Sequence, residues 1–276
     1  MINEESGEPK YSLVLPSHTE QVVTIFKHEI RKLLRSKRVI GIMVIAFLAS
    51  YALTNIIISN PEPSSGDDYF RYAVIFSPIL LIVAAALVGS DSLLVEFHEK
   101  TGYSLFPNPV SRTAIWFGKF LAAELIILII LGIFFGLFAA IAAAGKHQIS
   151  AELFFGAFPI SFLVATMMMS FAFLVSSVFK GPIGATITVL FALFVSPVAD
   201  GIIGAQQIVP WFTPFSSVNN AFLILLFGPE ENGEDRFFFP FGLYRNMPLE
   251  VSIAVITAYT VAGAIASITL FKKRDM

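Results

Sequence analysis

The sequence of 276 residues contains no cysteine and has few charged residues. Charged side chains make up 14% of it, whereas a soluble domain would carry roughly a quarter. The lack of cysteine excludes disulfides, thiolate metal sites and cysteine nucleophiles, although it does not identify the compartment. A net charge of −2 provides no general basic field of the kind expected of a nucleic-acid-binding protein.

Motifs of common active sites are also missing. A phosphate-binding loop needs the pattern Gly-x-x-x-x-Gly-Lys-Ser/Thr, and no such run occurs, since the Gly118-Lys119 pair is followed by Phe120. Neither His-Glu-x-x-His nor Gly-x-Ser-x-Gly occurs, and the four histidines are scattered along the chain. We therefore expect this chain to have no catalytic residues, no bound metal and no cofactor of its own.

Apolar residues dominate what the sequence does contain. They account for 56% of the chain, Phe alone occupies 29 positions, and the mean hydropathy is +0.77. Six apolar runs reach the roughly 20 residues that cross a bilayer core. They extend over about residues 39–58, 72–94, 115–144, 153–179, 183–203 and 249–271. We predict an all-α polytopic membrane protein with six transmembrane helices in one membrane domain, residues 38–272.

The distribution of Lys and Arg predicts the orientation of these spans. With the N-terminus inside, 14 of the 18 basic residues fall on inside segments and four on outside segments. Because basic residues favour the cytoplasmic side, both termini are predicted to be cytoplasmic, and the protein to lie in the cell (cytoplasmic) membrane. The first 38 residues lack the short apolar core of a cleavable signal peptide, so the first span is expected to act as the insertion signal.

Residues 17–37 are predicted to form an amphipathic interfacial helix on the inner membrane surface. Ser17 and Glu20 have the spacing of a capping box. The apolar face comprises Val22, Phe26, Ile30, Leu33 and Leu34, and the cationic row comprises Lys27, Arg31 and Arg35. The alternative is an ordinary basic flank of the first span. Residues 1–16 are expected to be disordered or loosely attached.

The segment 92–114 combines charges, a helix end and a rigid turn at one membrane face. It contains the runs Glu96-Phe97-His98-Glu99-Lys100-Thr101-Gly102 and Pro107-Asn108-Pro109-Val110-Ser111-Arg112. The helix of the second span is expected to end at Thr101-Gly102, because Gly accepts the left-handed conformation of a helix C-terminus. Ser111 is expected to cap the third span, with Trp116 at interfacial depth. The alternative is a solvated loop with chance charges.

This segment resembles the corresponding loop of ABC-2 type permeases of the NosY/NatB-like kind. The resemblance rests on Glu96, Thr101-Gly102, Pro109-Val110-Ser111-Arg112 and Gly118-Lys119, which follow a cytoplasmic helix that enters the first span. The order Thr-Gly departs from the Gly-Thr of many relatives, so the end of the helix is expected to shift slightly.

The resemblance implies a permease subunit of an ATP-driven transporter, with export as the expected direction. ATP and Mg would be bound by a separate P-loop ATPase subunit, and a second permease subunit, identical or related, would complete the transporter. The residues implied in docking of the ATPase are Glu96, Glu99, Lys100, Thr101, Gly102, Phe106, Pro109 and Arg112. The alternatives are an ATPase-independent channel or secondary transporter, and a membrane anchor or assembly subunit that transports nothing. The sequence does not identify the substrate.

Three further features lie within the predicted membrane domain. Asp91 and Glu124 are acidic residues within spans, and serve either in helix–helix hydrogen bonding or in a proton or cation relay. A stripe of small residues, expected to pack within the chain or alternatively to form a dimer face, comprises Gly132, Gly136, Ala140 and Ala144. The stretch 199–248 is predicted to be an extracytoplasmic loop, whose short apolar pieces lie in the interface or re-enter the protein.

Overall fold

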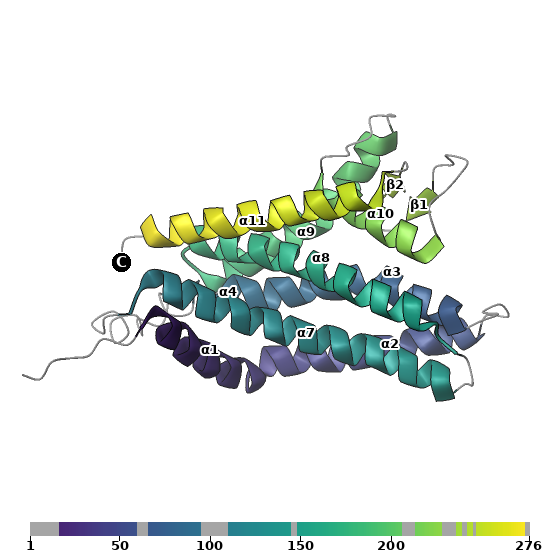
Figure 1. Ribbon diagram of the computed structural model, residues 1–276, viewed down its shortest axis with the longest axis horizontal. Helices are drawn as coiled ribbons and strands as arrows, with labels where there is room; N and C mark the ends of the chain where they lie inside the picture. The colour runs from purple at the N-terminus through teal and green to yellow at the C-terminus, as the bar shows by residue number, and fades with distance from the viewer. Residues whose placement is uncertain are drawn as a thin grey trace, which may run out of the picture.

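The computed structural model describes residues 17–59, 66–94, 110–144, 148–205, 213–227, 236–238, 242–244 and 247–273. These residues form a bundle of long helices that run roughly along one axis, with a two-stranded ribbon near one end (Figure 1). Residues 1–16, which are predicted to be disordered, lie outside the described residues.

The first half of the chain contributes α1 (His18–Leu34), α2 (Lys37–Ser59), α3 (Gly66–Ala84), the π-helical turn η1 (Ala85–Gly89) and α4 (Ser90–Ser92). The second half contributes α7 (Arg112–Ala144), α8 (Ala151–Val178), α9 (Pro182–Ala205), α10 (Pro214–Phe227), β1 (Arg236–Phe238), β2 (Gly242–Tyr244) and α11 (Leu249–Lys273). The two strands pair antiparallel, with Phe237 opposite Leu243. In Figure 1, α1, α4 and the C-terminal end of α11 lie at one end of the bundle, and α10, β1 and β2 lie towards the other.

Four helices among the described residues are long and apolar enough to cross a membrane. They cover Arg112–Ala144, Ala151–Val178, Pro182–Asp200 and Leu249–Lys273, which correspond to the third to sixth predicted spans. The prediction of a helical protein with several membrane spans is therefore confirmed. The first two predicted spans coincide with α2 and with α3 to α4, and their passage through the membrane stays a prediction.

Two glycines allow other helices to approach α8 closely. A Cβ atom on Gly89, at the end of η1, would lie 2.6 Å from Met169 Sδ and 2.7 Å from Ala172 Cβ. A Cβ atom on Gly263 of α11 would lie 2.8 Å from Ser170 Oγ. Ala172 Cβ cannot move without the backbone of α8, so the approach at Gly89 requires glycine, whereas a side chain at position 263 would displace the Ser170 hydroxyl. Helix α8 contacts α3, α7, α9, α10 and α11. Because other helices surround it, its three consecutive methionines, Met167 to Met169, are buried in the core.

The small-residue stripe of α7 does not pack as predicted. Gly132 and Gly136 are exposed, and a Cβ atom on either glycine would meet no described atom within 4 Å. The opposite face of α7 is buried instead, where the ring of Phe134 contacts the rings of Phe135 and Phe138. The prediction of close packing within the chain is therefore wrong for the described residues. The large aromatic side chains bury more apolar surface and decide which face of α7 turns inward.

The chain after α9 turns back and packs on the bundle as α10. The helix contacts α8, α9 and α11, and six of its apolar residues are buried, namely Phe215, Val218, Ala221, Phe222, Leu223 and Leu226. Asp200, near the end of α9, holds the start of α10. The Oδ2 atom of Asp200 accepts hydrogen bonds from Thr213 Oγ1 at 2.7 Å and from Ser216 N at 3.1 Å. This carboxylate satisfies an N–H group in the first turn of α10 that has no partner within the helix.

Replacing Asp200 with alanine is expected to lower the free energy of unfolding by roughly 0.5–2 kcal/mol, the usual cost of losing a helix cap. Asp200→Asn keeps one carbonyl oxygen as an acceptor and is expected to lose less. Thermal unfolding of the purified variants measures the difference. Equal midpoints for wild type and Asp200→Ala would show that the contact does not stabilise α10.

Candidate functional site

The ends of the segment 95–109 are held by one group of helices. The chain enters this segment after α4, and the described residues before it end at Leu94. They resume at Val110, just before α7 begins at Arg112. The return end contacts α1 directly, and the entry end is linked to α1 through Lys119 of α7. The site can therefore be described at its helical base, although the residues 95–109 themselves lie outside the described residues.

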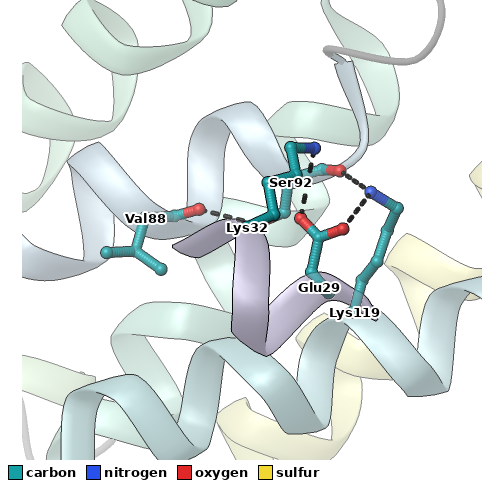
Figure 2. A network of polar contacts seen from close by, with 5 residues as sticks. All are labelled: Glu29, Lys32, Val88, Ser92 and Lys119. Carbon is teal, nitrogen blue, oxygen red and sulfur yellow. Dashed lines mark hydrogen bonds and ion pairs between the residues drawn. The ribbon is translucent and has the colours of Figure 1, made fainter. Parts of the chain in front are cut away.

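A buried lysine forms the first contact at this base. Lys119 Nζ donates to the backbone carbonyl of Ser92 at 2.7 Å and lies 3.3 Å from Glu29 Oε2 (Figure 2). Lys119 comes from α7, Ser92 from the last turn of α4 and Glu29 from α1. We call these three groups the Lys119 junction. It joins three helices at the point where the chain enters the segment 95–109.

The Lys119 junction is almost completely buried. Lys119 is 1% exposed and Glu29 is 3% exposed. On the outer side, Lys32 lies 3.4 Å from Glu29 Oε1 with 40% of its side chain exposed. A buried pair of charges is costly to desolvate, but loss of one partner leaves the other charge buried and uncompensated, which costs roughly 3–5 kcal/mol. The junction therefore favours one arrangement of α1, α4 and α7 over others.

A second contact lies where the segment 95–109 returns to the bundle. Ser111 N donates to Gln21 Oε1 at 3.0 Å, and His18 Nε2 lies 3.1 Å from Thr113 Oγ1. Ser111 Oγ also accepts from Ala114 N at 3.2 Å, which confirms that Ser111 caps α7. Gln21 and His18 both belong to α1, as Glu29 does. Helix α1 therefore holds the return end directly and the entry end through Lys119.

Helices α1 and α7 approach closely at Gly118. A Cβ atom there would lie 2.7 Å from Ile25 Cγ2, 2.8 Å from Ile25 Cβ and 3.1 Å from the carbonyl oxygen of Val22. The carbonyl and Ile25 Cβ cannot move without the backbone of α1. Gly118 thus allows the close approach, and the adjacent Lys119 then reaches Glu29. This explains physically why glycine precedes lysine at this point of the sequence.

The C-terminal helix adds a third contact. Arg112 Nη1 donates to the carbonyl of Lys272 at 2.7 Å, and Trp116 Nε1 donates to Ser267 Oγ at 2.9 Å. The Trp116 ring stacks on Phe120 with a centroid distance of 4.7 Å. A cationic side chain at the last carbonyls of a helix also complements the negative end of the helix dipole. The first turns of α7 are therefore fixed by both α1 and α11.

The predictions for α1 agree with the structure in part. The capping box of Ser17 and Glu20 is present, and the cationic residues Lys27, Arg31 and Arg35 are exposed. The apolar face packs against α7 through residues such as Val22 and Phe26, which line a groove with it. The position of α1 at a membrane surface stays a prediction.

Most of the predicted docking residues lie outside the described residues, namely Glu96, Glu99, Lys100, Thr101, Gly102, Phe106 and Pro109. Of that set the structure describes Arg112, the first residue of α7, whose side chain contacts the C-terminal end of α11. The predicted helix end at Thr101-Gly102 also falls outside. The backbone of Asp91 belongs to α4, and its side chain is outside the described part. Glu124 Oε2 accepts from Thr166 Oγ1 of α8 at 3.1 Å, which is the helix–helix hydrogen bond that was one of the two alternatives.

Trp116 packs inside the bundle. Its side chain is 1% exposed and contacts Phe173 of α8 and Ser267 of α11. The indole N–H donates to the Ser267 hydroxyl, and the rings of Phe120 and Phe173 provide an apolar wall, so both the polar and the apolar part of the side chain are satisfied. Its interfacial depth stays a prediction.

Sequence reasoning missed Glu29 and Lys119 as a pair. A signal was present, because Glu29 is three residues after Phe26 and four before Leu33, so it lies on the apolar face of the helix. An acid on the buried face of an otherwise basic helix requires a partner. The identity of that partner depends on how α1 packs against α7, which spacing alone does not supply.

Comparison with known proteins places this geometry in a family. A protein-family profile described as ABC-2 family transporter protein matches residues 23–276, which include the Lys119 junction and every described helix after α1. A search among curated proteins finds no match to the chain. The matched family and the apolar helices agree with the resemblance of the segment 92–119. The chain therefore belongs to the ABC-2 transporter family and is a multi-pass membrane protein, the permease subunit of an ABC transporter.

Proposed function

We propose that this permease exports its substrate and is driven by a separate ATPase that docks on the segment 92–114. The observation that supports the proposal is that α1 is linked to both ends of this segment, directly at Ser111 and through Lys119 at α4. The Lys119 junction fixes the end of α4, and Gln21 fixes Ser111. A push on the segment by a docked ATPase would therefore move α1, α4 and α7 together. Rigid-body rocking of helices is an established way to open a transporter to alternate sides.

The same segment is connected to the rest of the bundle through α4. Ser90 Oγ lies 2.7 Å from Thr186 Oγ1 of α9, and Gly89 lies against α8. The π-helical turn η1 ends at Gly89, immediately before Ser90, and such turns are frequent at functional sites. Motion of α4 would therefore reach α8 and α9 directly. These contacts support a mechanical path from the ATPase to helices across the bundle.

The remaining parts of the proposal are supported by the distribution of Lys and Arg along the chain and by the family to which the chain belongs. The protein would cross the cell (cytoplasmic) membrane six times, with both termini cytoplasmic, α1 on the inner surface, and 199–248 outside. Two permease subunits would form one transporter, since closed two-fold assemblies are the commonest arrangement. ATP and Mg would be bound and hydrolysed by the partner ATPase, with no catalytic group on this chain. The narrower likeness to NosY/NatB-like permeases stays a prediction.

Reversing two charges of the segment tests the docking. The double variant Glu96→Lys with Glu99→Lys is expected to reduce the ATPase recovered per permease several-fold, because the proposed attractive contacts of these glutamates with the ATPase would become repulsive. The ATPase rate of the complex is expected to return to that of the free ATPase. Glu152→Lys with Glu250→Lys is the matched control, since both glutamates are exposed and begin helices at the opposite end of the bundle.

Unchanged recovery and unchanged ATPase rate in the Glu96 and Glu99 variant would overturn the docking assignment. An ATPase-independent channel or secondary transporter instead predicts movement of solute by the chain alone. A membrane anchor or assembly subunit predicts a stable partner whose ATPase rate does not depend on this segment.

A further inference from the structure

A groove of about 420 Å³ lies between α1, α7 and α8. Its apolar walls are formed by Val22, Val23, Phe26, Leu121, Leu125, Leu128 and Phe162. The groove contains one polar side chain, that of Glu124. Val23 is 48% exposed and Leu121 is 47% exposed, so the groove opens on the outer surface of the bundle. It is separate from the Lys119 junction, whose charged groups do not line it.

Glu124 is buried in this groove, and one of its two carboxylate oxygens has no hydrogen-bond partner among the described residues. The residue is 7% exposed, and this oxygen is Oε1. The other oxygen, Oε2, accepts from Thr166 Oγ1, but this hydroxyl also lies 2.9 Å from the carbonyl of Phe162. A threonine hydroxyl has a single proton to donate, so the two acceptors share it.

No basic side chain of the described residues offsets the charge of Glu124. Lys119 comes from the same helix, but its ammonium group is engaged by Glu29 and the carbonyl of Ser92. Lys27 belongs to α1 and is exposed, and it does not line the groove. A buried acceptor without a donor is costly, and a carboxylate costs more than a neutral group. A donor that enters the groove would therefore satisfy this acceptor, and a charged donor would satisfy it best.

We propose that this groove binds an amphiphile with a protonated amine head. The ammonium group would donate to Glu124 Oε1, and the alkyl chain would lie along Val23, Phe26 and Leu128. An ammonium group carries three donors, and a charge-assisted hydrogen bond is about twice as strong as a neutral one. One carboxylate among apolar walls does not supply the six or more oxygens that Ca²⁺ requires. The proposal does not depend on the proposed docking of an ATPase.

Binding of dodecylamine to the purified full-length protein in lipid nanodiscs tests the proposal. Wild type is expected to show a saturable rise in the midpoint of thermal unfolding, and Glu124→Gln is expected to weaken the apparent affinity at least tenfold. Glu152→Gln is the matched control, because Glu152 is exposed at the start of α8, and its affinity is expected to equal that of wild type. Dodecanol, which has the same chain without a charge, is expected to bind at least tenfold more weakly than dodecylamine.

A second variant separates binding from folding. Val23→Trp would fill the groove from its exposed side while keeping the carboxylate, and it is expected to reduce dodecylamine binding as Glu124→Gln does. Equal affinity of dodecylamine for wild type and Glu124→Gln would overturn the proposal, as would equal stabilisation by dodecanol. If Glu124→Gln does not fold, full binding by Val23→Trp would overturn it, and loss of binding would support it.

Discussion

Replacing Lys119 with methionine is expected to lower the free energy of unfolding by roughly 3–5 kcal/mol, the cost of leaving one charge of a buried pair without its partner. Glu29 would remain 3% exposed, with only the half-exposed Lys32 beside it. The carbonyl of Ser92 would also lose its donor. Because α1 and α4 would no longer be joined, we expect the ATPase rate of the complex to fall to that of the free ATPase.

Three companion variants distinguish the ion pair from the loss of packing. The double variant Glu29→Gln with Lys119→Met removes both charges and is expected to recover part of the stability, because buried ion pairs are often replaceable by neutral groups. The swapped pair Glu29→Lys with Lys119→Glu is expected to recover little. Its new carboxylate would face the carbonyl of Ser92, and two acceptors cannot share a hydrogen bond. Lys32→Ala is the control, with an expected cost of roughly 0–1 kcal/mol for an exposed pair.

Thermal unfolding of the purified chain and the ATPase rate of the reconstituted complex measure these effects. A Lys119→Met variant as stable as Lys32→Ala would show that the junction does not hold the helices. A stable Lys119→Met variant with full stimulation of the ATPase would show that the joint between α1, α4 and α7 plays no part in coupling.

Replacing Gly118 with alanine is the second change expected to have a large effect. The added methyl group would lie 2.7 Å from Ile25 Cγ2 and 3.1 Å from the carbonyl oxygen of Val22, so α1 must move away from α7. Overpacking of this kind costs roughly 1–3 kcal/mol. Displacement of α1 would also weaken the contacts of Lys119 with Glu29 and of Ser111 with Gln21, so both the stability and the ATPase stimulation are expected to fall.

Gly132→Ala provides a matched control on the same helix. A Cβ atom there meets no described atom within 4 Å, and alanine favours a helix over glycine by about 1 kcal/mol. The two identical substitutions are therefore expected to have opposite signs, which thermal unfolding of the two variants will show. A Gly118→Ala variant that is stabilised like Gly132→Ala would contradict the close packing of α1 on α7.

The sequence predicts much of the helical framework. The capping pair Ser17 and Glu20, the cap at Ser111 and the positions of the long helices all follow from local patterns and appear in the structure. Local rules suffice here because a cap and an apolar run are satisfied within a few residues or by the bilayer.

The site depends on contacts that local patterns do not contain. Glu29 and Lys119 are 90 residues apart, and their pairing follows from the approach of α1 to α7 at Gly118. The stripe of Gly132 and Gly136 fails for the same reason, because packing elsewhere on α7 decides which face is buried. Trp116 is buried because α11 brings Ser267 to its indole nitrogen. Each case requires knowledge of which helices are neighbours.

Affinity purification of the chain from its native membranes in mild detergent tests the central claim most directly. The claim is that a separate ATPase drives this permease through the segment held by α1. We expect a subunit with a P-loop to co-purify with the wild-type chain, and to be lost when residues 96–106 are scrambled but kept in Gly132→Ala. Recovery of the chain alone at several detergent strengths, or full recovery of the ATPase with the scrambled segment, would contradict the claim.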